Sequence, residues 1–169
     1  GVIHGDANDH NLVVTGSGCE ARVSGLIDFG DAMDSPLVCG LAIALAYAML
    51  DKPDPVASAA HVVRGYHAVR PLSDLELELL YPLALTRLAV SVTNSATEQR
   101  LRPDDPYIII SEAPAWSLLE KLETVHANYP HYAFRHACGL EPVPNSKRVR
   151  NWLALHQERI GPVVEADLR

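Results

Sequence analysis

The residues best suited to chemistry lie close together near the start of the chain. Asp6 stands in the string His4-Gly5-Asp6, Asn11 follows on the next segment, and a second aspartate, Asp28, precedes Phe29-Gly30. One carboxylate can accept the proton of a substrate hydroxyl, while an amide oxygen and a second carboxylate hold Mg²⁺ against nucleotide phosphates. The set therefore predicts phosphoryl transfer: Asp6 would act on the hydroxyl, His4 would brace the loop, and Asn11 and Asp28 would hold the metal.

A β-hairpin is expected to bring these residues together. The apolar segments 11–15 and 22–27 are predicted strands, and Gly16-Ser17-Gly18 turns the chain between them. Such a hairpin places Asp28, at the end of the second strand, beside Asn11, at the start of the first.

The rest of the chain has the pattern of helices separated by proline-containing breaks. Ser35 is the expected N-cap of the first helix, with Pro36 in its first turn. Pro82 is expected to kink the third helix, and Gly139 to end the fifth. The predicted fold class is mainly α with a small β-hairpin, the helices covering residues 37–50, 56–68, 75–101, 107–127, 132–138 and 148–160.

Composition excludes several classes of protein. A chain of 169 residues that is 48% hydrophobic can bury a core of its own. A net charge of −7, without a long basic stripe, argues against nucleic acid as a partner. The most apolar run, residues 36–50, is too short to span a bilayer, and no targeting segment is recognisable, so no membrane partner is expected. Three widely spaced cysteines indicate reduced thiols in a cytoplasmic protein.

The order of His-Gly-Asp, Asn and Asp-Phe-Gly resembles the catalytic motifs of the aminoglycoside phosphotransferase and choline kinase-like family. The similarity is strongest to hydroxylysine kinases and bacterial kinase–aminotransferase fusion proteins, and it is carried by residues 2–11, 25–31, 35–50 and 110–116. The resemblance implies a kinase-like fold in which residues 1–140 form the C-terminal lobe and the N-terminal lobe is absent. Residues 141–169 are then a proline-containing linker and a terminal helix.

The same resemblance implies an activity. The expected protein is a Mg²⁺-dependent kinase that transfers the γ-phosphate of ATP or GTP to the hydroxyl of a small amino alcohol, hydroxylysine-like. Without the N-terminal lobe, which covers the nucleotide, this chain alone is expected to be inactive. In some bacterial relatives an aminotransferase-like region is fused to the kinase-like region, and such a region is a candidate continuation here.

Further polar residues have two interpretations each. Arg87, Ser91 and Asn94 share one face of the predicted third helix. They either bind the acceptor, with Arg87 on a carboxylate, or satisfy one another inside the helix bundle. His10 either approaches the acceptor or caps the loop. Asp31 either pairs with the loop or a helix start, or approaches the metal.

Two alternative functions follow from the same sequence. A metal-hydrolase cluster could be drawn from His4, Asp6, His10 and Asp28, but it leaves Asn11 and Phe29-Gly30 unexplained. A non-catalytic binding or scaffolding module of a larger protein is favoured by the absent lobe and by Gly40, which stands where many relatives carry an acidic residue. The retention of Asp6, Asn11 and Asp28 together favours the enzyme.

Overall fold

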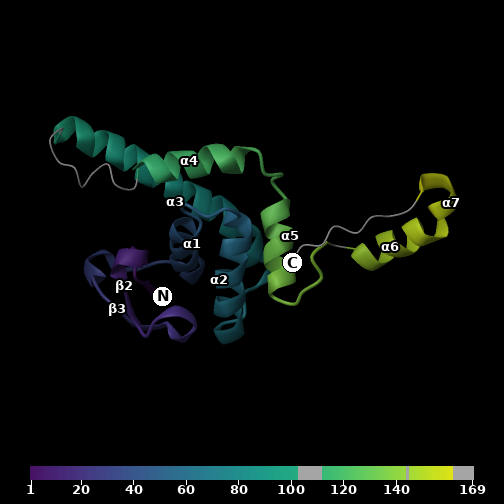
Figure 1. The fold of residues 1–169 in the computed structure, drawn as a ribbon, viewed down its shortest axis with the longest axis horizontal. Coiled ribbons are helices and arrows are strands. Elements are labelled where there is room, and N and C mark those ends of the chain that lie inside the picture. The colour runs from purple at the N-terminus through teal and green to yellow at the C-terminus, as the bar shows by residue number, and fades with distance from the viewer. Residues whose placement is uncertain (103–111, 144, 162–169) are drawn as a thin grey trace.

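Two short antiparallel strand pairs precede a body of helices in the computed structural model (Figure 1), which describes residues 1–102, 112–143 and 145–161. Strand β1 (Val2–Ile3) pairs with β4 (Met33–Asp34). Strand β2 (Leu12–Thr15) pairs with β3 (Arg22–Leu26). The predicted fold class, mainly α with a small hairpin, is confirmed.

The β2–β3 hairpin forms where the sequence predicts it. Leu12 lies opposite Leu26, and the Ile27 N–H donates to the Asn11 carbonyl at 3.0 Å, so the chain reaches Asp28 directly beside Asn11. The β1–β4 pair was not predicted as strands, because two residues are too few to show an alternating pattern.

Seven helices follow within the described residues. The first three are α1 (Leu37–Ala48), α2 (Pro55–Val69) and α3 (Asp74–Leu101). The others are α4 (Glu112–Glu123), α5 (Tyr129–Ala137), α6 (Ser146–Leu155) and α7 (Gln157–Ile160). The N-terminus of α3 is a capping box, because the Ser73 hydroxyl accepts from the Glu76 N–H while the Glu76 carboxylate accepts from the Ser73 N–H.

Helix boundaries differ from the prediction at both ends of the series. Ser35 lies outside α1: Pro36 takes the N-cap position and makes no side-chain cap, so the first helical residue is Leu37. The predicted final helix is two helices, because the backbone leaves the helical path at His156, whose N–H donates to the Leu153 carbonyl at 3.1 Å.

Two middle helices were also misplaced. The predicted helix 107–127 begins outside the described residues and ends at Glu123 instead of residue 127. Helix α5 begins at Tyr129, three residues before the predicted start, because Pro130 fits the first turn of a helix. Gly139 follows this helix with φ +73°, as predicted, and its N–H donates to the His136 carbonyl at 2.9 Å.

The core lies where α1, α2 and α3 meet α4 and α5. Helix α1 packs on α2 and α3, α5 packs on α2 and α3, and α4 packs along α3 (Figure 1). Several large core side chains are less than 2% exposed: Leu45, Met49, Val63, Leu77, Leu80 and Phe134. The strands attach to this body through β1, which packs on α1. The helical body therefore provides the rigid support for the N-terminal loops.

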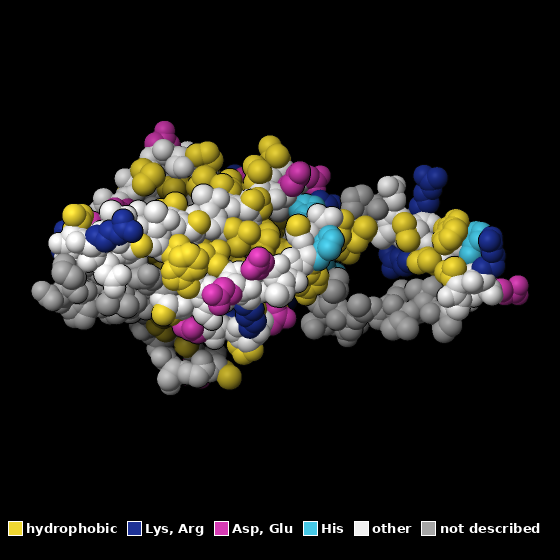
Figure 2. Space-filling model, turned by 90° about the horizontal axis from the view of Figure 1, so that it is seen from above, with side chains coloured by type: hydrophobic (Ala, Val, Ile, Leu, Met, Phe, Trp, Pro, Cys, Tyr) yellow, Lys and Arg dark blue, Asp and Glu magenta, His cyan; other side chains and the backbone are white. Residues whose placement is uncertain are grey.

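Helices α6 and α7 lie apart from this body and bury no residue (Figure 1). Hydrophobic and basic side chains are mixed on this end of the molecule in Figure 2. Trp152 and Leu155 of α6 are exposed. The division into residues 1–140 and 141–169 remains a prediction. Across the described ranges, no helix combines the length and the apolar character needed to cross a membrane.

Candidate active site

The loop between β1 and β2 presents Asp6, and Gly5 allows it to do so. Gly5 has φ +83°, and a Cβ at this position would lie 2.1 Å from the Asp31 carbonyl oxygen. Only glycine has both the backbone conformation and the room for this approach. The loop therefore packs directly on the 3₁₀ turn Phe29–Asp31 that follows Asp28.

His4 ties the loop to the end of β3. Its Nε2 lies 2.9 Å from the Ile27 carbonyl oxygen, and its Nδ1 accepts from the Asp6 N–H at 3.3 Å. Because a carbonyl can only accept, the ring proton is on Nε2. The ring also lies against Phe29, with 4.8 Å between ring centroids. Both nitrogens are engaged inside the chain, so His4 is not free to bind a metal and the hydrolase cluster loses one of its ligands.

The Asp6 carboxylate receives four hydrogen bonds. Its Oδ1 accepts from Arg87 Nη2 at 2.8 Å and from the Tyr47 hydroxyl at 3.1 Å. Its Oδ2 accepts from Asn8 Nδ2 at 2.8 Å and from Asn11 Nδ2 at 3.2 Å. The loop thus holds one oxygen and the helices hold the other. The Asp6 side chain is 24% exposed, so the carboxylate remains within reach of a ligand.

The Asn11 amide has a fixed orientation. Its Nδ2 faces two acceptors, the Asp6 carbonyl at 2.9 Å and Asp6 Oδ2, so only the nitrogen can lie on that side. The amide oxygen therefore points the other way. Asn8 supports this arrangement, because its Oδ1 accepts from the Asn11 N–H at 3.0 Å. Asn11 is buried, with its side-chain amide held by Asp6 and its backbone N–H held by Asn8.

Asp28 lies next to Asn11 in an unusual backbone conformation. Its φ is +61° and its ψ +70°, and its exposed side chain accepts a long hydrogen bond of 3.4 Å from the Gly30 N–H. A carboxylate and an amide oxygen are ligands that Mg²⁺ accepts. In the part of the chain that the structure describes, no three His, Cys, Asp or Glu side chains gather closely enough to hold a metal. An ion at Asn11 and Asp28 would therefore complete its coordination with water and with oxygens of a bound ligand.

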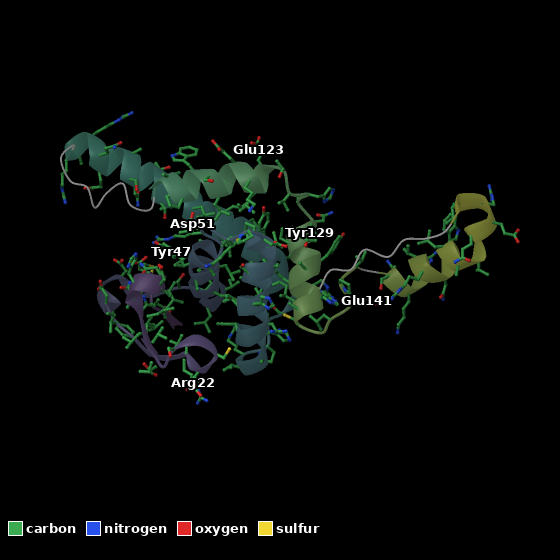
Figure 3. The ribbon with its side chains drawn as sticks, in the orientation of Figure 1. Arg22, Tyr47, Asp51, Glu123, Tyr129 and Glu141 are labelled. Atoms are coloured by element: carbon green, nitrogen blue, oxygen red, sulfur yellow. The ribbon has the colours of Figure 1, made fainter. Side chains whose placement is uncertain are left out.

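Two helices reach into this site, one of them unexpectedly. Arg87 comes from α3 and Tyr47 from α1, and Arg87 Nη2 also donates to the Tyr47 oxygen at 2.8 Å. Figure 3 labels Tyr47 where α1 meets the N-terminal strands. Tyr47 was not among the predicted residues. The available signal was a lone phenol in an otherwise apolar helix, because a partly buried tyrosine hydroxyl usually needs a partner.

The other predicted site residues lie outside this network. Ser91 is half-buried and Asn94 exposed, and within the described residues neither is hydrogen-bonded to Arg87, so the three do not satisfy one another. The side chains of His10 and Asp31 are exposed. Asp31 contacts the loop through its backbone carbonyl, which packs against Gly5.

Gly40 has a packing role in this chain. A Cβ built on Gly40 would lie 3.2 Å from both Cβ and Cγ2 of Ile3, which is tight contact. The glycine lets β1 lie close against α1 just before the loop begins. An acidic side chain at this position would press on Ile3, so the close packing of β1 on α1 favours glycine here.

Comparisons with known proteins point to phosphotransferases. Residues 1–76 match the model of the phosphotransferase enzyme family, and this part of the chain holds the strands, the loop, α1 and α2. Its curated relatives include hydroxylysine kinases: 32% identity to the Mus musculus protein over 126 residues, 31% to the Xenopus laevis protein over 126 residues, and 32% to the Danio rerio protein over 121 residues. The predicted resemblance is thereby confirmed.

These matches cover a larger share of this chain than of its relatives. Each takes in 70% of this chain but only 33% to 34% of the relative, so the chain spans about a third of the length of these kinases. No solved structure matches the chain.

Proposed function

We propose that this chain is part of a Mg²⁺-dependent small-molecule kinase that transfers a nucleotide γ-phosphate to a hydroxyl group. The observation that carries the proposal is the geometry at Asp6, Asn11 and Asp28: a well-positioned carboxylate beside an amide whose oxygen points away from Asp6, and a second carboxylate. The family match over residues 1–76 supports the reaction class. The similarity to hydroxylysine kinases supports a hydroxylysine-like amino alcohol as the acceptor.

The residues divide the reaction between them. Asp6 takes the proton of the acceptor hydroxyl as the acceptor oxygen bonds to the γ-phosphorus, and the bond from that phosphorus to the bridging oxygen breaks, releasing a nucleoside diphosphate. Asn11 and Asp28 would hold the Mg²⁺, which neutralises charge on the phosphate oxygens when bound. His4 keeps Asp6 oriented, because His4 Nδ1 accepts from the Asp6 N–H while His4 Nε2 donates to the Ile27 carbonyl at the end of β3.

In this proposal residues 1–140 form the C-terminal lobe of a kinase-like fold. The chain spans about a third of its curated relatives, so the remaining contacts to the nucleotide would come from other parts of the complete protein. ATP and GTP both fit the proposal as phosphate donors. A fused aminotransferase-like region remains a prediction from the family resemblance.

The proposal predicts that Asp6→Asn in the complete gene product abolishes transfer. Loss of a general base typically lowers kcat by about 10²- to 10⁴-fold, whereas nucleotide binding should change little because Asn11 and Asp28 remain. Steady-state phosphorylation of hydroxylysine and a nucleotide Kd measure the two effects. Asp9→Asn, an exposed change in the same loop, is the matched control and should retain activity.

Two results would contradict this assignment. Near-normal turnover of Asp6→Asn would remove the proposed base. A wild-type protein that binds nucleotide but phosphorylates no hydroxylated amine would favour the non-catalytic module instead.

A further inference from the structure

Every acceptor position of the Asp6 carboxylate is occupied. A carboxylate offers about four lone-pair directions, and Asp6 receives donors from Arg87, Tyr47, Asn8 and Asn11 at 2.8 to 3.2 Å. An acceptor hydroxyl needs one of these positions before Asp6 can take its proton. One of the four donors must therefore leave when the acceptor binds.

The two loop donors are poorly placed to leave. The Asn8 side chain also accepts from the Asn11 N–H, and the Asn11 side chain also donates to the Asp6 carbonyl. Each amide is thus fixed by a second hydrogen bond within the same loop. Moving either one would disturb the loop that positions Asp6 itself.

Arg87 is the donor best placed to leave. It reaches Asp6 from α3, and its side chain is 26% exposed. A single nitrogen, Nη2, serves both Asp6 and Tyr47, whereas Nε is buried without a hydrogen-bond partner among the described residues. A buried unpaired donor is unfavourable, so the guanidinium gains from a movement that gives Nε a partner. A carboxylate that binds Arg in a bidentate manner provides two parallel hydrogen bonds where Asp6 receives one.

We propose that Arg87 is a positioning residue that occupies Asp6 Oδ1 until the carboxylate of the acceptor takes over its guanidinium. This inference rests on the proposed kinase function and adds control of the same site. Asp6 becomes available to a hydroxyl only when an acceptor that carries a carboxylate is bound. Without such an acceptor, Asp6 has no position free for a water molecule, and hydrolysis of the nucleotide is suppressed.

The inference is tested in the complete gene product by two rates, nucleotide hydrolysis and phosphorylation of the acceptor, which one substitution should change in opposite directions. Arg87→Met frees one position on Oδ1, so Asp6 can take a proton from water as the water oxygen bonds to the γ-phosphorus and the nucleoside diphosphate leaves. Acceptor-independent hydrolysis should rise about tenfold, while kcat/KM for hydroxylysine should fall about 10- to 100-fold, the value of a charge-assisted hydrogen bond. A variant with purely structural damage would lower both rates.

The acceptor carboxylate is tested separately. Wild-type protein should prefer hydroxylysine over its decarboxylated analogue, 1,5-diaminopentan-2-ol, by about tenfold or more, and Arg87→Met should abolish that preference. Arg70→Met is the matched control, because Arg70 pairs with Glu76 away from Asp6 and its loss should leave both rates and the preference unchanged.

A second variant keeps the test decisive if Arg87→Met does not fold. Tyr47→Phe removes the other donor to Oδ1 without changing the charge, and it should also raise acceptor-independent hydrolysis. Hydrolysis that is unchanged or lower in the folded variant overturns the inference. An equal fall in kcat/KM for both acceptors in Arg87→Met also overturns the inference. That result leaves the proposed kinase function intact. Wild-type protein that phosphorylates neither acceptor overturns the proposed function itself.

Discussion

A methyl group added to Gly5 has no space to occupy. Its Cβ would lie 2.1 Å from the Asp31 carbonyl oxygen, at a φ of +83° that side chains rarely adopt. We therefore expect Gly5→Ala to displace the loop and to reduce transfer about 100-fold or more, as small misplacements of catalytic groups do. Kinetic assays on the purified protein measure this loss.

The control for this change lies in α2. A Cβ at Gly65 meets nothing within 4 Å, so Gly65→Ala should leave activity intact and stabilise the protein by about 0.5–1 kcal/mol through helix propensity. If Gly5→Ala is as active as Gly65→Ala, the loop does not need the close approach to Asp31.

At the residue scale, the site residues that lie close together in the sequence could be predicted. Asp6, Asn11 and Asp28 stand in a short recognisable order, and the hairpin between them explains why they meet. Tyr47 and Arg87 could not be assigned to Asp6 in the same way, because they lie 41 and 81 residues from it. No local pattern specifies a contact over such a separation; it depends on how α1 and α3 pack.

Among the elements, α3 has the best-defined beginning. The Ser73 N–H holds the pKa of the Glu76 carboxyl below its usual range, helped by Arg70 and the Ser73 hydroxyl. The carboxylate therefore stabilises the fold at pH values above its unfolded pKa of about 4.3. That contribution is lost as the pH falls through the lower pKa of the folded state.

We expect Ser73→Ala to lower the free energy of unfolding by about 1 kcal/mol near neutral pH and to weaken its fall in acid. Urea unfolding at about pH 7 and about pH 3 measures both effects. Ser117→Ala, an exposed change inside α4, should alter neither. Equal acid sensitivity in the wild type and Ser73→Ala would show that the hydroxyl adds nothing to the pKa shift.

Element prediction succeeded where periodicity and breakers agreed. Leu37 marks the start of α1, and residues 55–69 and 74–101 form α2 and α3 within one residue of the prediction. The break at His156 could not be predicted, because histidine is neither a strong helix former nor a strong helix breaker. The backbone conformation of His156, which separates α6 from α7, is visible only in the structure.

Across the whole molecule, stability should come from the helical body. Leu45 is fully buried in α1, which packs on α2 and α3, whereas Leu155 in α6 is 83% exposed. Leu45→Ala is expected to lower the free energy of unfolding by about 2–5 kcal/mol, from lost burial and the remaining cavity. Leu155→Ala should change it by about 0.5 kcal/mol or less. Comparable losses in both variants would mean that α6 is packed in solution.

The long-range contacts of Asp6 have a consequence for the order of folding. Its bonds to Asn8 and Asn11 close short loops, whereas its bond to Arg87 closes a loop of 81 residues. Short closures are entropically easier and form sooner, and the long one must wait until α1 and α3 have docked. The helical circular dichroism signal can therefore recover fully during refolding before the hydrogen bond from Arg87 holds Asp6 in place. Circular dichroism alone is then an incomplete measure of native protein, and recovery of activity is the stricter one.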